Sequence, residues 1–326
     1  MRHILLLLAS CIILCGCKKE SAENASENTS VSTPVVLQLN WKPEPQFGGF
    51  YAGNVEGVFA RHGLAVDVRE GGKGAPTIQM LAANQVEFGI VSADEIVTAR
   101  SKGNDVVGLF AVYQTCPQGL MTRKSRGFKK IGDIFKAEGT VAMERGLTYA
   151  LLMESKFGFG KVKIVPSPFG NLSVYQSDPN YAMQCFVTSE PLAAKKVGAP
   201  EPQTFLIADA GYNPYTTVLA INGKRLTENP DVAKHMVAAV RESWEAYLKD
   251  PKRTNAAMGE LNPTMDAATF EESAKVQIPL IQTPDTQTSK LGVMTDARWK
   301  TLIDQMVEFK AIDSAVQPGD CYKLVD

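Results

Sequence analysis

The chain has 326 residues, of which 44% are hydrophobic and 21% are charged, with a formal net charge of −1 at pH 7. This composition is that of an ordinary globular protein. No Lys/Arg-rich block is present, which argues against nucleic acid as a partner. Only the first apolar run approaches the length of a membrane span, and about 290 residues remain after the N-terminal segment, enough for one large domain or two modest ones.

The N-terminal segment has the features of an export signal. Arg2 and His3 precede the apolar run ILLLLASCIIL, which suits a secretory signal and is too short to span a bilayer comfortably. The run ends in LCGC, and a leucine three residues before Cys17 with a glycine directly before it resembles the lipobox of bacterial lipoproteins. The resemblance implies a signal peptide at 1–16, acylation of Cys17, and an exported protein lipid-anchored to a bacterial membrane. An ordinary secretory peptide with incidental cysteines is the alternative.

Residues 17–34 are rich in Ser, Glu, Asn and Thr and are expected to form a disordered tether. Three cysteines then remain, at positions 116, 185 and 321. Their odd number and the absence of a CxxC spacing argue against a zinc site, so we expect no metal. Cys116 and Cys185 either pair in an oxidising compartment or remain as thiols, and the sequence leaves both open.

Short apolar strands alternate with helical patterns from Val35 onward. We expect strands in the segments 35–41, 64–71, 86–92 and 105–114, and helices in the segments 50–63, 75–85 and 93–103. Gly63 suits the left-handed position after a helix end, and Pro76 suits a first turn. This rhythm predicts an α/β fold with a largely parallel sheet.

A second unit with the same rhythm begins near residue 119. The strand 139–146 leads into a helix at 147–158, and the segments 161–169, 181–198 and 202–211 follow. The strand 216–223 then leads into the longest helix, 229–250, where Asn229 is placed to cap and Pro230 to occupy the first turn. Apolar residues recur every four positions along this helix, which predicts core packing, at Val232, Met236, Val240, Trp244 and Leu248.

The segments LNWKPEPQFGGFYAG, GLAVDV, VEFGIVSADEI and CFVTSEPLAAKKVG resemble the solute-binding lipoproteins of ABC importers. The most similar branch binds thiamine pyrimidine precursors and related heteroaromatics, and its superfamily also contains a pyrimidine-synthesising enzyme. The resemblance implies the two-lobed fold of periplasmic binding proteins (type II), in which two crossing strands form the hinge and ligand sits in the cleft. The first lobe would comprise 35–115 and 213–326, and the second lobe 116–212.

The resemblance and the strand pattern place the aromatic stretch after the first strand at the cleft, since ligands in open α/β sheets lie beyond the carboxyl ends of strands. We expect Trp41, Phe47 and Tyr51 to form a wall that stacks on a flat ligand. Packing between the lobes is the alternative for Trp41. Phe50 and Phe59 are expected to face the core.

Polar candidates follow other strands. Ser92 and Glu95 match a capping box, and this role accounts for Glu95. Asp94 has no such role and is expected to accept a hydrogen bond from a ring amine. Ser92 can cap the helix and also line the cleft. Gln114 and Gln118, where the chain crosses to the second lobe, carry the donor and acceptor that a heteroaromatic edge requires, and one of them is expected to line the cleft. Glu190 opens a helix in the segment that the resemblance places at the cleft, although the helix dipole alone would stabilise it there.

The leading hypothesis is a monomeric receptor, not an enzyme, that passes a small heteroaromatic solute to an ABC permease and its ATPase. A thiamine pyrimidine precursor is the first choice of solute, riboflavin the second, and sulfonate or nitrate-type anions the third. The competing class is the pyrimidine-synthesising enzyme, which the resemblance associates with a lysine-bound pyridoxal phosphate and an active-site histidine. Only His62 and His235 follow the signal. His62 precedes the helix-ending Gly63 and His235 lies beside the long amphipathic stripe, so both are expected at the surface and we expect no cofactor.

Overall fold

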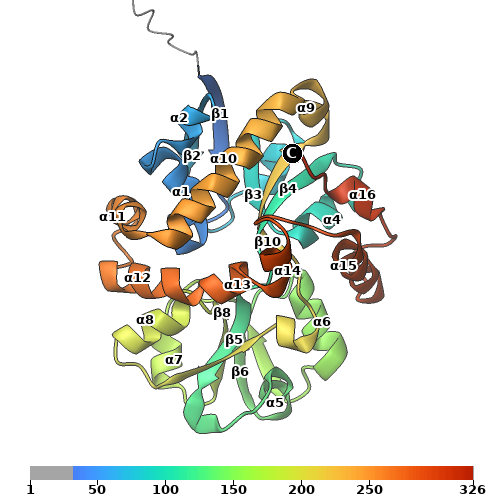
Figure 1. Cartoon of the computed structure of the whole chain (residues 1–326). Coiled ribbons are helices and arrows are strands. Elements are labelled where there is room, and N and C mark those ends of the chain that lie inside the picture. The colour runs from blue at the N-terminus through green and yellow to red at the C-terminus, as the bar shows by residue number, and fades with distance from the viewer. Residues whose placement is uncertain (1–31, 326) are drawn as a thin grey trace, which may run out of the picture. The chain divides into compact units, whose positions relative to one another are not determined.

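The computed structural model describes residues 32–325 and contains two five-stranded sheets (Figure 1). The predicted signal peptide, Cys17 and most of the predicted tether lie outside the described residues. The first sheet has the order β2 (Leu64–Arg69), β1 (Thr33–Gln38), β3 (Phe88–Val91), β10 (Thr216–Asn222), β4 (Val106–Tyr113). The second has the order β7 (Val162–Val165), β6 (Gly139–Ala142), β8 (Tyr181–Phe186), β5 (Gln118–Arg123), β9 (Pro202–Leu206).

Both sheets are mixed, and their strand directions follow the same pattern. In the first sheet β1 pairs parallel with β2 and β3, whereas β10 runs antiparallel between β3 and β4. In the second sheet β6 pairs parallel with β7 and β8, whereas β5 runs antiparallel between β8 and β9. The predicted largely parallel sheets are therefore each interrupted by one strand that enters directly from the other sheet. The predicted α/β fold of two lobes is confirmed.

Helices flank both sheets. Those of the first sheet include α1 (Gly48–Val55), α2 (Val58–Arg61), α3 (Thr77–Ala82) and α4 (Ala93–Ser101). Those of the second sheet are α5 (Ile131–Lys136), α6 (Thr148–Phe157), α7 (Ser173–Ser177) and α8 (Glu190–Lys196). The C-terminal third adds α9 (Gly223–Glu228), α10 (Pro230–Lys249), α11 (Lys252–Leu261), α12 (Ala267–Val276), α13 (Ile278–Ile281), α14 (Pro284–Thr288), α15 (Asp296–Glu308) and α16 (Pro318–Cys321). Short 3₁₀ turns occur at η1 (Pro45–Phe47), η2 (Lys124–Arg126) and η3 (Ala208–Ala210).

Helix α10 is the long amphipathic helix that the sequence predicts. Met236, Val240 and Trp244 are buried in the core, and Pro230 lies in the first turn. Asn229 occupies the N-cap position, but its side chain makes no capping hydrogen bond. The stripe therefore packs against the first lobe as expected, while the predicted cap is absent.

The stretch after β1 folds differently from the expected loop of rings. It forms η1 and α1, and Phe47 and Tyr51 lie in the core with 1% and 7% of their surfaces exposed. Two glycines allow this, because a Cβ at Gly48 would lie 2.1 Å from the Tyr247 ring and one at Gly49 would lie 2.2 Å from the Trp244 ring. The glycines thus permit α1 to pack closely on α10, instead of marking a loop.

Two segments connect the sheets, one after β4 and one before β10, and side chains tie them together. Arg298 of α15 donates to the Gln114 carbonyl (2.8 Å) in the first segment and to the Asn213 carbonyl (3.1 Å) in the second. Asn213 adds a second bridge, since its Oδ1 accepts from the Cys116 amide at 2.8 Å. The hinge is therefore braced by a helix from the end of the chain.

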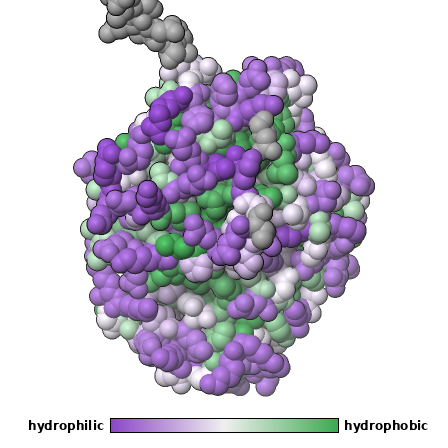
Figure 2. All heavy atoms as spheres, in the orientation of Figure 1, coloured by the Kyte–Doolittle hydropathy of each residue, from purple (hydrophilic) through white to green (hydrophobic). Residues whose placement is uncertain are grey.

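The surface of the described residues is largely polar in the view of Figure 2, and their cysteines are free thiols. Polar residues cover most of the face shown in Figure 2, and apolar residues are visible mainly between the helices. Among residues 32–325 no helix is both long and apolar enough to cross a bilayer. Cys116, Cys185 and Cys321 are buried free thiols, so the structure contains no Cys116–Cys185 disulfide.

Candidate functional site

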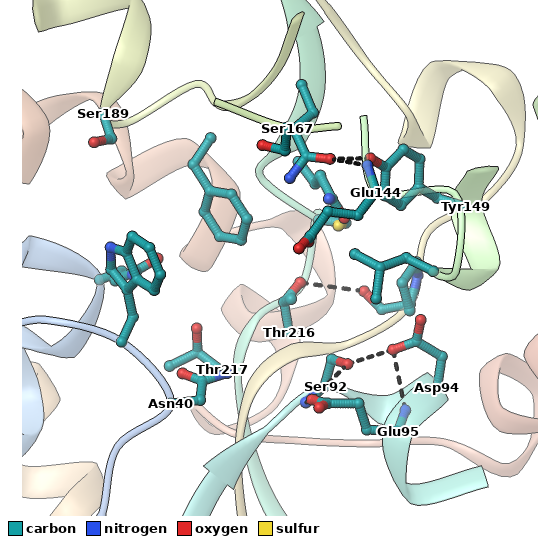
Figure 3. A pocket seen from close by; sticks show the side chains of 18 of the residues that line it. Asn40, Ser92, Asp94, Glu95, Glu144, Tyr149, Ser167, Ser189, Thr216 and Thr217 are labelled. Carbon is teal, nitrogen blue, oxygen red and sulfur yellow. Dashed lines mark hydrogen bonds between the residues drawn. The ribbon is translucent and has the colours of Figure 1, made fainter. Parts of the chain in front are cut away.

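A pocket of about 280 Å³ lies between the two sheets, near the lower end of the roughly 300–1,000 Å³ typical of ligand sites. In Figure 3, Asn40, Ser92, Asp94, Glu95, Thr216 and Thr217 lie on one side of it, and Glu144, Tyr149, Ser167 and Ser189 on the other. In the first set Asn40 follows β1, Ser92, Asp94 and Glu95 follow β3, and Thr216 and Thr217 begin β10. The second set follows strands of the second sheet or lies in α6. The pocket is thus built from both lobes.

Trp41 is the ring of the first lobe that lines the pocket. Its Nε1 donates to Glu44 Oε1 at 3.1 Å, and its carbonyl accepts from the Gly71 amide at 2.9 Å. Gly71 is required there, because a Cβ would lie 2.4 Å from the Leu39 carbonyl oxygen. These contacts hold the indole at the pocket wall, where it is placed to stack on a flat ligand.

The turn between β3 and α4 supplies three polar side chains. Ser92 and Glu95 form the predicted capping box, in which the Ser92 amide donates to Glu95 Oε2 at 2.8 Å. Asp94 accepts from the Ser92 hydroxyl and, at 3.0 Å, from the Tyr212 hydroxyl. Burial, and secondarily the charge of Asp94, raises the pKa of Glu95 to about 7. Glu95 also lines the pocket, although the capping box explained it fully from sequence.

Glu44 and Glu190 approach the pocket from opposite lobes. Glu44 lies just before η1, while Glu190 is the first residue of α8 and its Oε2 accepts from the Phe186 amide at 2.8 Å. Burial, and then the charge of Glu190, raises the pKa of Glu44 to about 7. Burial also raises the pKa of Glu190. The two carboxyls therefore disfavour being ionised together in the pocket without a positive neighbour.

Gln184 is fixed on the second-lobe side. Its Oε1 accepts from the Glu144 amide at 2.8 Å and from the Tyr149 hydroxyl, which leaves its amino group as a donor (Figure 3). Tyr149 comes from α6, which follows β6 as the sequence predicts. Neutral hydrogen-bonding groups thus accompany the carboxylates.

Two strained backbone positions line the same pocket. Among the described residues four non-glycine residues have a positive φ, and two of them, Phe169 (49°) and Thr217 (53°), are in the lining. A β-branched residue such as Thr217 rarely adopts this conformation, which costs roughly 1–3 kcal/mol. Strain of this kind concentrates where side chains are positioned for ligands.

Of the side chains predicted to bind ligand, the structure brings together five that line the pocket: Trp41, Ser92, Asp94, Glu190 and Gln118, the alternative to Gln114. Phe47 and Tyr51 lie outside the lining because η1 and α1 place them in the core. Gln114 is 3% exposed and faces the hinge, where its Oε1 accepts from Arg298 at 3.1 Å. The ligand-binding roles of the five lining residues remain predictions.

Sequence reasoning missed several lining residues. Glu44 and Gln46 lie within the aromatic stretch LNWKPEPQFGGFYAG. Their carboxyl and amide side chains were the only signals in the sequence that could have indicated a place in the pocket. Phe169 and Phe186 supply the rings that Phe47 and Tyr51 do not. Thr217 left no sequence signal, because its unusual backbone conformation is not encoded by a glycine or asparagine.

The pocket has a one-sided charge. Five carboxylates line it, and none of its described lining residues is Lys, Arg or His; the carboxylates are Glu44, Asp94, Glu95, Glu144 and Glu190. Lys73 stands at the edge, its Nζ 4.2 Å from the centre of the Phe169 ring. In residues 32–325 no cluster of His, Cys, Asp and Glu has the geometry of a metal site. The arrangement suits a ligand that donates hydrogen bonds or carries positive charge, and opposes an anion.

Two mixed α/β lobes, joined by two crossing segments around a pocket, define the fold of periplasmic binding proteins. The periplasmic aliphatic sulphonate binding protein of Escherichia coli has this fold and superposes with a TM-score of 0.70 at 12% identity. The superposition covers 90% of this chain and 94% of that chain.

The chain belongs to the NMT1/THI5 like family, whose sequence model matches residues 44–254. Its relatives include a 4-amino-5-hydroxymethyl-2-methylpyrimidine phosphate synthase of Candida albicans, 21% identical over 71% of this chain and 72% of that protein. They also include a Brucella abortus protein, named provisionally as a binding protein, 21% identical over 82% of this chain and 83% of that protein. The relatives of this chain therefore include a protein named as a synthase and a protein named as a binding protein.

Proposed function

We propose that this protein is the solute receptor of an ABC importer and binds a small flat heteroaromatic solute in the pocket between its lobes. The observation that carries the proposal is the lining itself, in which Trp41, Phe169 and Phe186 accompany five carboxylates and no described basic residue. Rings provide faces for stacking, and carboxylates accept hydrogen bonds from ring amines. The fold supports the receptor class, since the sulphonate binding protein shares it.

A thiamine pyrimidine precursor is the first choice of solute. An aminopyrimidine offers a flat face and an exocyclic amine, and its single ring suits a cavity of about 280 Å³. Riboflavin, with three fused rings and a ribityl chain, requires more room and is second. Sulfonate or nitrate is third, because the lining would repel an anion.

The same lining supports the receptor hypothesis over the synthase hypothesis. A lysine-bound pyridoxal phosphate would need a lysine in the pocket and groups that accept a phosphate, and the described lining contains neither lysine nor histidine. The five carboxylates would also repel the phosphate. The residues present therefore do not fit that cofactor, which supports a non-enzymatic role.

The transport role carries further proposals. The protein is exported, acylated at Cys17 and tethered to a bacterial membrane by the residues between Cys17 and β1. It acts as a monomer with lobes at 35–115 plus 213–326 and at 116–212, and delivers solute to a permease and its ATPase. Closure of one lobe on the other would exclude water from the pocket.

A thermal-shift screen tests the proposal, because a ligand that binds only the folded state raises the melting temperature. The panel contains aminopyrimidines, flavins, sulfonates and nitrate. We expect the largest increase with an aminopyrimidine and none with the anions. A sulfonate or nitrate that stabilises the protein while every heteroaromatic fails would refute the proposed ligand class. Conversion of a bound pyrimidine to a phosphorylated product would refute the non-enzymatic role.

A further inference from the structure

We propose that the solute is a cation and that its charged group is held between Glu44 of the first lobe and Glu190 of the second. The positive charge then joins the two lobes and selects the closed form of the pocket. This inference rests on the proposed receptor function and specifies which solutes the receptor accepts.

The two carboxyls come from elements that meet only across the pocket. Glu44 precedes η1 and receives the Trp41 Nε1 hydrogen bond (3.1 Å), whereas Glu190 begins α8 and receives the Phe186 amide (2.8 Å). Ser189, the residue before Glu190, lies close enough to Glu44 to lower the pKa of Glu44. The N-terminal end of α8 thus lies near Trp41 and Glu44 of the first lobe.

The groups around Glu44 and Glu190 do not neutralise the negative charge of these two carboxylates. Lys42 lowers the pKa of Glu44, but it is exposed to solvent and does not line the pocket. The charge of Glu44 raises the pKa of the buried Tyr113 hydroxyl, and the charge of Glu190 raises the pKa of the buried Cys185 thiol. Both groups are neutral in their ordinary protonated forms and cannot balance a carboxylate. The other charged groups of the lining are the carboxylates Asp94, Glu95 and Glu144. Bringing the lobes together therefore brings negative charges together, and a cation between them removes the repulsion.

A separate observation indicates that a ligand completes this pocket. Gln46, in η1, lines it and is only 8% exposed, yet its side-chain amide has no hydrogen-bond partner among the described residues. Its amide atoms are not among the fully buried unpaired ones, so they are accessible from the pocket, where they can pair with a ligand. A solute with a ring nitrogen or an exocyclic amine would satisfy Gln46, while its charged group lies at the carboxyl pair.

The ring faces suit a cation as well. Trp41 is the aromatic residue that attracts cations most strongly, and its indole is anchored to Glu44 itself. A cation at this corner would therefore contact a ring face and the Glu44 carboxylate together. A neutral solute of the same shape would keep the ring contact and lose the attraction to both carboxylates.

Three compounds on one ring separate charge from shape. We would measure Kd by titration calorimetry at pH 7.5 for 4-amino-5-aminomethyl-2-methylpyrimidine (a cation), its 5-hydroxymethyl analogue (neutral) and the phosphate ester of that alcohol (an anion). We expect the cation to bind at least about tenfold more tightly than the alcohol, and the phosphate ester not to bind. The pair 3-aminomethylpyridine and 3-hydroxymethylpyridine repeats the comparison on a second ring.

Variants identify the carboxyls responsible. Glu44→Gln and Glu190→Gln should each reduce the preference for the cation to about twofold or less. Glu144→Gln serves as the matched control, because it removes a carboxylate of the same pocket that is not part of the pair. This variant should keep most of the preference for the cation. Small-angle scattering should show that the cation lowers the radius of gyration of the wild type but not of either paired variant. Melting curves without ligand confirm that each variant folds.

The outcomes separate this inference from the proposed function. If the alcohol binds as tightly as the amine on both rings, the receptor function stands and the cation proposal is wrong. An equal loss of preference in Glu144→Gln would assign the effect to overall charge and overturn the role of the pair. If no compound of the wider panel stabilises the protein, both proposals fail.

Discussion

Replacement of Glu95 by glutamine should stabilise the protein at neutral and alkaline pH but not in acid. In the folded state burial raises the pKa of Glu95 from 4.5 to about 7, so folding favours the protonated carboxyl. The corresponding stability is fully present below pH 4.5 and is lost as the pH rises through about 7. Glutamine resembles the protonated form and can complete the same capping box with Ser92.

The size of the effect follows from the two pKa values. A difference of about 2.5 pKa units corresponds to about 3 kcal/mol, at about 1.4 kcal/mol per unit. The gain in unfolding free energy of Glu95→Gln over the wild type should grow from about zero at pH 4.5 to about 3 kcal/mol at pH 8. Urea unfolding of both proteins across this range measures it.

A control variant excludes general charge effects. Glu271 is exposed and its pKa is lowered by a hydrogen bond from Lys275, so Glu271→Gln should show no gain between pH 5 and 8. If the difference between Glu95→Gln and the wild type is the same at pH 4.5 and pH 8, Glu95 is not held in its protonated form and our account of this turn is wrong.

Four further predictions concern the pocket, the fold and the anchor. Trp41→Ala should weaken solute binding roughly tenfold or more, about 1.4 kcal/mol, with an unchanged melting temperature, whereas Trp41→Phe should lose less; calorimetry decides. Gly49→Ala should cost about 1–3 kcal/mol because its Cβ would meet an α10 ring, while Gly72→Ala, with open space around it, should be neutral in urea unfolding. Cys17→Ser should move the protein from membranes to the soluble exported fraction, and unchanged membrane association would contradict acylation. Binding of a cationic pyrimidine at pH 7 should release protons, since positive charge lowers the pKa of Glu44 from about 7; calorimetry in buffers of different ionisation enthalpy detects it.

The strand and helix rhythm was readable from sequence because each element carries its own periodicity. The direction of β5 and β10 was not, since a strand's direction depends on which sheet the chain arrives from. The capping box of Ser92 and Glu95 was predicted from a local pattern and is present. Local signals were therefore reliable, and the pairing of distant segments had to come from the structure.

The same distinction explains which of the predicted residues line the pocket. Trp41 was found because its loop follows a strand end directly. Phe47 and Tyr51 were misplaced because the packing of Gly48 and Gly49 on α10 depends on residues about two hundred positions away. Gln114 was misplaced for a similar reason, since Arg298 engages it from α15.

The contacts of Arg298 also have a consequence for how the chain divides its tasks. Every described strand lies between Thr33 and Asn222, so both sheets are complete before α9 begins. The side chain that links the two crossings nevertheless comes from α15. Residues beyond 290 therefore add no strand and reach a sheet only through isolated bridges of Gly292 and Tyr322 with β4, but Arg298 among them ties together the two segments about which the sheets would pivot. Substitutions there offer a way to alter the speed of opening and closing without touching a single residue that lines the pocket.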